Sequence, residues 1–454
     1  MSTSDGRRQG PADPSAPPAV RARETWVVLG LAALVGALSA VGATVYSSLV
    51  HETEALLWDT LPSSWGADVV PAWWVFLVLG TGAVAVWGAK HLHGHGGHHP
   101  LGGLAFDITP RQLPSTLLAA FATLVCGAVV GPEAPLLAIG TSIGFVAVAR
   151  ARSDRAKILV IAGAAAALGV VMGNPLVTVF LILEAALLMP GSKSPQPLTQ
   201  LLPVLVALGT GYLVHVGIAD WPGMSSHPLD AGDLGTYGTV DPTDLAVGAV
   251  VALAAGALVI AATRSAETLR PLADRHPLPV ILGGGLLIAA IAVVARAISG
   301  EDVDTVLFSG QSTMSALTDA GALALVVIAV AKAAGYAISL GTGFRGGSIF
   351  PAVYLGMAVG ALGSFVPGAT LPGLVACGIA AGAAATLGMP LTSTMLAVLL
   401  TASAGPAVTV TAILGAVIGV MLKVWLDRRR AGVRPDLPGV DDDLSLRRTG
   451  TRES

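Results

Sequence analysis

Two stretches of this chain, more than two hundred residues apart, repeat one another. Aligning Pro135 with Pro351 also pairs Gly131 with Gly347, Gly140 with Gly356 and Gly144 with Gly360. Further along, at almost the same distance, Gly173 and Pro175-Leu176 match Gly388 and Pro390-Leu391 with a shift of one residue. Each copy opens with a Gly/Pro-rich break, at 131–135 and 346–351, followed by an apolar run. Matching interruptions in two halves of a membrane protein mark helices that begin inside the bilayer around one shared site. The chain is therefore predicted to be a duplicated membrane domain.

The composition excludes an ordinary soluble protein. Hydrophobic residues make up 54% of the chain and charged residues 12%, with a mean hydropathy of +0.75, whereas charged residues approach a quarter of a soluble domain. Several apolar runs are shorter than the ~20 residues of an upright crossing. Short helices that end mid-bilayer are tolerated where other protein or water satisfies the freed backbone groups. We predict an all-α membrane protein, a polytopic helical bundle of two inverted repeats with broken, tilted helices.

The repeat also divides the chain into segments. We expect a disordered tail at 1–24, repeat one at about 25–216, a linker at 217–244, repeat two at about 245–426 and a second tail at 427–454. The two repeats and their linker form a membrane domain at 25–426. An inverted relation is preferred because it brings both half-helix N-termini to one point from matched directions.

The charged residues outside the apolar runs predict an orientation. Basic residues gather in the N-terminal tail, around Arg150, and from Lys423 to Arg430, whereas acidic residues predominate in the linker and at 301–304. Basic loops stay on the cytoplasmic side of a membrane. Both termini are therefore expected to be cytoplasmic, in a protein of the cell membrane.

The two breaks carry the chemistry of an anion site. A helix that starts inside the bilayer presents unpaired backbone N–H groups and the positive end of its dipole. Such a site needs no cationic side chain, and it can hold a halide weakly enough to release it. The candidate anion-binding residues of the breaks are Gly131, Ala134, Gly347, Ser348, Ile349 and Phe350.

Glu133 is the candidate gate. It is a carboxylate in the first break with apolar segments on both sides, where an ionisable group is costly and usually functional. Among N–H donors at a helix N-terminus, a carboxylate can occupy the place of an anion when ionised and leave it when protonated. The alternative is an ordinary first-turn acid that stabilises a helix dipole at the surface.

At these residues the chain resembles the CLC family of chloride channels and proton/chloride exchangers. The family's GREGP signature, with its gating glutamate, is similar to GPEAP at 131–135, and its GxFxP signature is similar to GSIFP at 347–351. The likeness covers about residues 70 to 425. It implies a CLC-like fold, a glutamate-gated pathway for chloride or a similar anion, and a homodimer with a separate pore in each subunit.

Three departures from the family pattern bear on selectivity. Gly97 stands where the family has a serine that gives its hydroxyl to the central anion, and no tyrosine near the C-terminus replaces the second hydroxyl ligand. Gly97 is thus a candidate backbone ligand, and Ser348 a candidate compensating hydroxyl. Pro132 replaces the family's arginine and removes one N–H group. We expect weak or altered anion selectivity.

A fourth departure bears on coupling to protons. Exchangers of the family carry a pair of acids after the proline-leucine helix, and the second acid passes protons to the cytoplasm. Here Glu184 is followed by Ala185. The resemblance therefore favours a passive or weakly coupled channel over a standard proton-coupled chloride antiporter, which remains the alternative. Glu184 is a candidate proton relay, or a buried acid bonded to the backbone at a helix end.

Metal handling is a hypothesis of another class. Five of the nine histidines lie in one loop, at His91, His93, His95, His98 and His99, where they could bind a metal or titrate near neutrality. A solvated loop is the simpler interpretation, since the membrane segments offer almost no other ligands apart from Glu133 and Glu184. No metal site, cofactor or nucleic-acid partner is predicted. No helix carries a His or Asp placed to activate a serine, so an enzyme is not expected.

Overall fold

In the computed structural model of the protein, the described residues are 18–103, 106–151, 157–188, 197–219, 221, 229 and 231–430. They are helical and contain no β-strand, only one isolated bridge between two glycines. Predictions for 1–17, for 431–454 and for linker residues 220, 222–228 and 230 lie outside these residues.

Repeat one contains seven of the main helices. They are α1 (Pro18–Ala55), α3 (Ala72–Ala89), α4 (Leu113–Val125), α5 (Glu133–Ala151), α6 (Ile158–Val171), α7 (Pro175–Leu188) and α8 (Pro197–Ile218). A π-helical turn (Leu56–Thr60) and the short α2 (Leu61–Ser64) extend α1, and a 3₁₀ turn (Pro100–Gly102) follows α3.

Repeat two supplies the helices from α9 onward. It contains α9 (Pro242–Arg275), α10 (Pro277–Ser299), the short α11 (Ala316–Asp319), α12 (Ala322–Thr342), α13 (Ile349–Gly363), α14 (Leu371–Leu387), α15 (Pro390–Leu400) and α16 (Val408–Arg430), with 3₁₀ turns at Val303–Thr305, Gln311–Thr313 and Ala402–Ala404.

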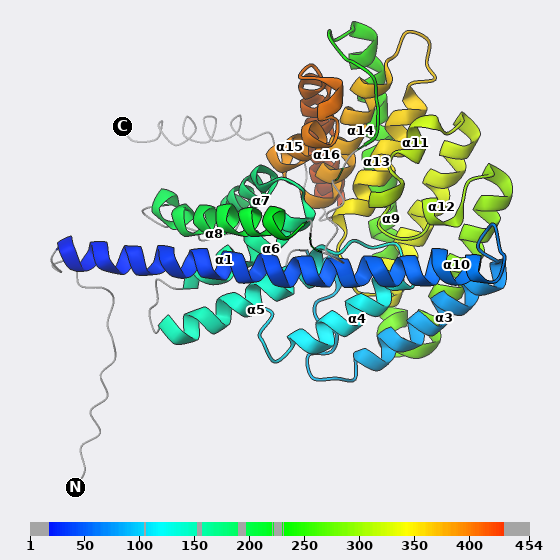
Figure 1. Cartoon of the computed structure of the whole chain (residues 1–454). Helices are drawn as coiled ribbons and strands as arrows, with labels where there is room; N and C mark the ends of the chain where they lie inside the picture. Colours follow the sequence, from blue (N-terminus) through cyan, green and yellow to red (C-terminus); the bar gives the residue numbers. More distant parts are fainter. Residues whose placement is uncertain are drawn as a thin grey trace, which may run out of the picture.

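The two repeats pack in the same way. In repeat one α5 packs on α6, which contacts α1 and α8, and in repeat two α13 packs on α14, which contacts α9 and α16 (Figure 1). A Cβ atom at Gly140 would collide with the carbonyl of Gly163, and one at the equivalent Gly356 would collide with that of Gly378. Small residues that let helix backbones touch are typical of membrane proteins. The duplication seen in the sequence is therefore also a duplication of contacts.

The helix lengths agree with a broken membrane fold. Among the described residues, eight helices are long and apolar enough to cross a membrane, and six apolar helices have only 10–17 residues. The short helices include α13, which begins at the second break, and the matching pairs α6/α14 and α7/α15. The predicted fold class is confirmed.

The helix ends differ slightly from the predicted boundaries. α8 ends at Ile218, α9 begins at Pro242 and α16 ends at Arg430. α1 begins at Pro18, so residues 18–24 are helical and not part of a disordered tail. A proline at the first helical position followed by Ala, Arg and Glu, which favour helices, accounts for this difference.

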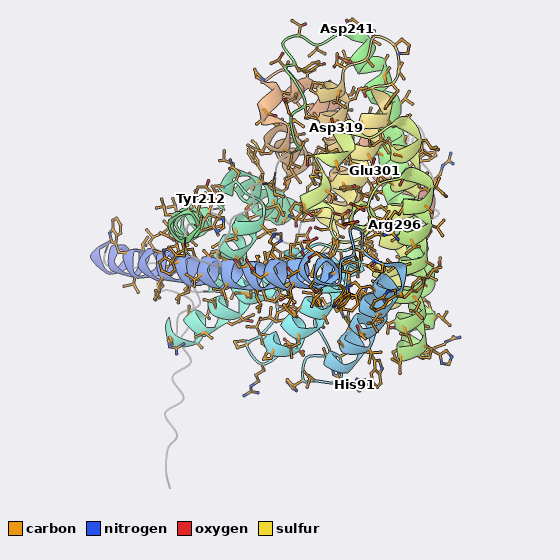
Figure 2. All side chains as sticks on the ribbon, turned by 45° about the vertical axis from the view of Figure 1, so that its right-hand side comes forward. His91, Tyr212, Asp241, Arg296, Glu301 and Asp319 are labelled. Atoms are coloured by element: carbon orange, nitrogen blue, oxygen red, sulfur yellow. The ribbon has the colours of Figure 1, made fainter. Side chains whose placement is uncertain are left out.

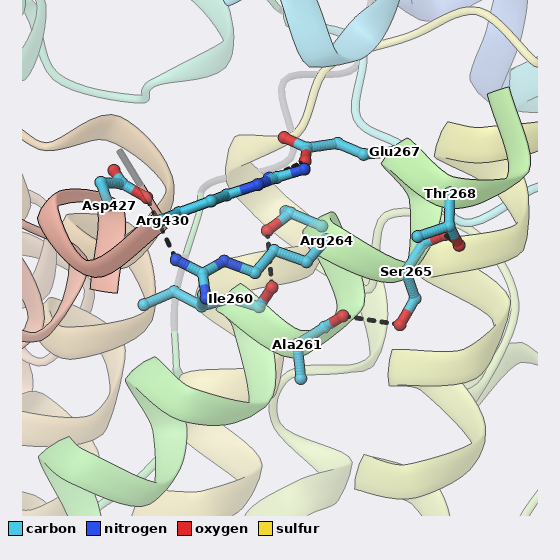
Figure 3. Close-up of polar contacts among 9 residues, drawn as sticks. Ile260, Ala261, Arg264, Ser265, Glu267, Thr268, Asp427 and Arg430 are labelled. Carbon is cyan, nitrogen blue, oxygen red and sulfur yellow. Dashed lines mark hydrogen bonds and ion pairs between the residues drawn. The ribbon is translucent and has the colours of Figure 1, made fainter. Parts of the chain in front are cut away.

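Two titratable side chains mark the two ends of the molecule. His91, at the end of α3, and Asp241, just before α9, lie at opposite ends in Figure 2. Ion pairs join α9 to α16: Arg264 Nη2 lies 3.2 Å from Asp427 Oδ1, and Arg430 contacts Glu267 (Figure 3). These exposed pairs are remote in sequence from both breaks.

Candidate functional site

The two breaks meet inside the protein. The N–H of Gly131 donates to the carbonyl of Gly347 at 2.8 Å, and the N–H of Gly347 donates to the carbonyl of Gly131 at 2.5 Å. This antiparallel bridge joins the two residues that the repeat alignment makes equivalent. The chain directions are opposite where the repeats touch, in keeping with an inverted pair. Because both N–H groups are used, neither glycine can donate to a ligand.

Glu133 crosses from one repeat to the other. It is the first residue of α5, and its Oε1 accepts hydrogen bonds from the N–H groups of Ile349 and Phe350, at 3.1 and 3.0 Å, in the first turn of α13. The side chain is 1% exposed. Its Oε2 has no hydrogen-bond partner among the described residues. A carboxylate thus occupies the place where a helix N-terminus attracts an anion.

Helix α12 holds both breaks through side chains that are fully buried. Ser339 Oγ accepts from the N–H of Val129, just before the first break, at 2.9 Å, and the Tyr336 hydroxyl donates to the carbonyl of Ser348 at 2.9 Å. Lys332 Nζ donates to two carbonyls of the segment between α10 and α12. Sequence reasoning missed Tyr336 and Ser339. The available signal was their spacing on an apolar helix: Tyr336 follows Lys332 by four residues and Ser339 follows Tyr336 by three, which places all three on one face.

Two cavities end at the first break. One, of about 340 Å³, is lined by Glu133, Ala134, Gly347, Ser348 and Ile349 among the predicted residues. The other, of about 410 Å³, is lined by residues of α1 and of the segment before α12, and it reaches Pro132. The two lining sets share no residue, although Pro132 and Glu133 are neighbours. The buried Glu133 side chain therefore lies where the two cavities approach each other.

The duplicated membrane fold agrees with the family comparison. A sequence profile of the family described as voltage gated chloride channel matches residues 69–424. The protein belongs to this family, the CLC family. It is accordingly an integral membrane protein.

Known CLC-family relatives and structures cover most of the chain. YfeO of Escherichia fergusonii, a protein to which ion transport has been ascribed, is 28% identical over 418 residues, or 89% of this chain and 94% of YfeO. The crystal structure of a slow cyanobacterial Cl⁻/H⁺ antiporter has a TM-score of 0.70 at 17% identity, covering 89% of this chain and 98% of that one. A CLC-type fluoride/proton antiporter has a TM-score of 0.68 at 16% identity, covering 90% and 98%. At such identities these structures establish the CLC fold alone.

Gly97, predicted as a backbone ligand in place of the CLC serine, does not line the first cavity. Its N–H donates to the carbonyl of Gly94 at 3.0 Å, and a Cβ atom at Gly97 would collide with Thr116. Residues 94–97 all have positive φ, which turns the loop so that its neighbours Gly96, His98 and His99 face the cavity. Gly97 therefore has no free donor for an anion.

Glu184, the candidate relay of this CLC protein, lies in α7, and its carboxylate reaches the start of α15 in repeat two. Its carboxylate accepts from the N–H groups of Leu391 and Thr392, at 2.8 and 2.7 Å, and from the Thr392 hydroxyl at 2.5 Å. It caps the first turn of α15 and is 6% exposed. Ala185 lines the cavity instead. These contacts fit the structural alternative for Glu184.

The clustered histidines point to different partners. His91 Nδ1 lies 2.9 Å from the Trp87 carbonyl, His98 Nε2 lies 3.3 Å from Asp107 Oδ1, and His99 Nδ1 accepts from the N–H of Leu101. Within the described ranges, no three His, Cys, Asp or Glu side chains gather closely enough to hold a metal ion. The geometry thus gives the metal hypothesis no support from this loop.

Proposed function

We propose that this protein carries small inorganic anions, chloride above all, across the membrane along a pathway gated by Glu133. One observation carries the proposal: Glu133 Oε1 accepts from the N–H groups of Ile349 and Phe350 at a helix start inside the protein. A chloride ion would need the same two donors. The carboxylate and the anion therefore compete for one place.

Protonation of Glu133 is the proposed opening step. The ionised carboxylate is held by two charge-assisted hydrogen bonds, and protonation removes its charge and weakens that hold. The side chain can then leave, and the two N–H groups can receive an anion from either cavity. The Gly131–Gly347 bridge uses only backbone atoms, so it can keep the breaks together while the gate moves.

The proposed mode is channel-like, with weak coupling to protons at most. Support comes from Glu184, whose carboxylate is engaged by α15, and from Ala185, which puts a methyl group on the cavity wall. Proton-coupled antiport is the second candidate. It is favoured by Glu133 Oε2, which has no partner among the described residues on a side chain that lines a cavity. Protons could reach that oxygen through water from the cavity.

Weak discrimination among anions is also proposed. Ser348 lines the cavity, and its carbonyl is already bonded to Tyr336. Gly97 supplies neither a hydroxyl nor a free amide. The gate region is then built from backbone N–H donors at a helix start, which can receive anions of several kinds. Chloride, bromide and nitrate should pass at comparable rates.

The orientation of the protein in the membrane is proposed from its charged residues, and its oligomeric state from the family resemblance. The last turn of α16 carries Arg428, Arg429 and Arg430, and a basic end of this kind is typical of the cytoplasmic side. We place both termini in the cytoplasm of a cell-membrane protein. A homodimer with one pathway per subunit is proposed from the family resemblance.

Flux from liposomes tests the function. Liposomes that contain the purified protein are loaded with chloride and diluted into an impermeant anion. They should release chloride, and release should be faster in acid. Glu133→Gln should make the release independent of pH. Glu267→Gln serves as the matched control, because Glu267 is an exposed acid of α9 that pairs with Arg430 of α16. Absence of anion flux at any pH would contradict the function. A Glu133→Gln variant with the wild-type pH response would contradict the gate.

The same liposomes separate the two modes. A chloride gradient imposed across the membrane should drive little or no uphill proton movement through a channel. A fixed number of protons moved per chloride would replace the channel-like mode with antiport, while leaving the anion pathway and the gate in place.

A further inference from the structure

Arg345 lies beside the pathway, in the segment that joins α12 to α13. It comes just before Gly346 and Gly347, and its backbone N–H donates to Thr123 Oγ1 at 3.1 Å. The bridge to Gly131 and the contact with α4 therefore fix its backbone from two sides. Its side chain lines the same cavity as Glu133.

The guanidinium group of Arg345 has donors that the protein leaves unused. Nη2 reaches the carbonyl of His95 only at 3.5 Å, the outer limit of a hydrogen bond. Nε and Nη1 are shielded from solvent and have no hydrogen-bond partner among the described residues. A guanidinium carries a permanent charge and five N–H donors, and a buried charge without partners is costly. The missing partner has to be an acceptor, and an anion suits the charge best.

The glycine-rich loop builds one wall of this place. Residues 94–97 all have positive φ, and a Cβ atom at Gly96 would lie 3.6 Å from Arg345 Nε. The positive φ of Gly96 favours glycine at this position, which lets the loop lie against the guanidinium. His98 and His99 continue the same wall of the cavity.

The charges around Arg345 are mostly positive. Lys90 Nζ donates to the carbonyl of Gly343, and burial together with Arg345 lowers the pKa of Lys90 to about 8. Burial and Arg270 lower the pKa of Arg345 to about 10, which leaves it charged at neutral pH. The opposing acid, Asp274, lies 4.0 Å from Arg270. The surroundings of Arg345 thus have a local excess of positive charge that a bound anion would relieve.

We propose that the cavity contains a second anion site, in which Nε and Nη1 of Arg345 bind a small inorganic anion before it reaches the donors held by Glu133. The inference rests on the proposed function, because the bound ion is the one transported. A guanidinium fork also matches planar oxyanions. The site should therefore accept nitrate at least as well as chloride.

Arg345→Gln, Arg345→Lys and the control Arg264→Gln test the site. Arg264 is an arginine outside the cavity, paired with Asp427. Two quantities are measured with sodium chloride and sodium nitrate as probes: the rise in melting temperature of the purified protein, and the half-saturating concentration for uptake into liposomes. Arg345→Gln should raise the half-saturating concentration of both anions about tenfold, the usual loss for a charge-assisted hydrogen bond, and remove the rise in melting temperature. Arg264→Gln should change neither.

Arg345→Lys keeps the charge without the fork, so it should recover chloride binding but not nitrate binding. Unchanged half-saturation in Arg345→Gln, or wild-type nitrate binding in Arg345→Lys, would overturn the site while leaving the pathway intact. If Arg345→Gln does not fold, the comparison of nitrate binding between wild type and Arg345→Lys decides whether the site exists. Failure of the proposed function looks different: wild-type protein would move no anion into liposomes, even if Arg345 still binds one.

Discussion

Gly347 forms the backbone bridge to Gly131 and also leaves the space that the Glu133 carboxyl group occupies. The bridge needs only the N–H and carbonyl of Gly347, whereas a Cβ atom built on Gly347 would overlap the carboxyl group of Glu133. One missing side chain thus allows the Glu133 carboxyl group, the proposed gate, to lie directly against the junction of the repeats.

Gly347→Ala should therefore disturb the gate and spare the bridge. The added methyl group would push the carboxylate away from the N–H groups of Ile349 and Phe350. We expect chloride efflux at neutral pH to rise several-fold and to lose most of its pH dependence, measured in liposomes. Gly88→Ala, at an α3 position with open space around it, should behave as wild type. A Gly347→Ala protein with the wild-type pH profile would show that the carboxylate does not close the pathway from this position.

Glu184→Ala should lower stability and leave transport intact. The substitution removes three hydrogen bonds to the first turn of α15. It leaves the buried N–H group of Thr392 and the partly buried N–H group of Leu391 without these partners. The expected loss in free energy of unfolding is about 2 to 4 kcal/mol, measured by denaturation in detergent. Chloride efflux per folded molecule should keep its pH dependence. A stable variant that lost its response to pH would instead make Glu184 a proton relay.

Tyr336→Phe should loosen the second break. The hydroxyl is the donor for the Ser348 carbonyl, and its removal should cost about 1 kcal/mol. The half-saturating chloride concentration should change several-fold, because Ser348 lines the cavity beside the gate. Tyr237→Phe is the control, since its hydroxyl binds Asp244 and not the breaks. Equal effects of the two variants on chloride would reduce Tyr336 to a packing role.

His99 predicts how stability responds to acid. Burial, followed by repulsion from Arg345, lowers the pKa of His99 to about 4, below the ordinary value of about 6.5. Between these two values the unfolded chain binds more protons than the folded one, so this residue contributes a loss of stability as pH falls. His99→Gln should therefore show a smaller drop in melting temperature on acidification than wild type. His98→Gln, at an exposed side chain beside Asp107, is the comparison. An identical acid response in His99→Gln and wild type would contradict a neutral, half-buried His99.

Neighbouring residues were enough to predict the helices and the breaks. Apolar runs interrupted by glycine and proline at 131–135 and 346–351 predict helices that begin inside a membrane, because backbone freedom and hydrogen bonding are local properties. The position of Glu133 within a break also follows from its neighbours alone. The duplication is also visible in the sequence. Gly140 follows Pro135, and Gly356 follows Pro351, at the same distance, and the two glycines make equivalent helix contacts.

The tertiary structure decided which distant groups meet. Glu133 and Glu184 both lie in repeat one, yet each carboxylate caps a helix of repeat two. Nothing near Glu184 in the sequence indicates α15, and nothing near Arg345 indicates the loop at 94–97. Such pairings depend on how whole helices pack through their glycine contacts, and a packing arrangement is a property of the assembled repeats. For this reason the sequence alone predicted an anion site with a candidate gate, while the partners of the Glu133 carboxylate came only from the fold.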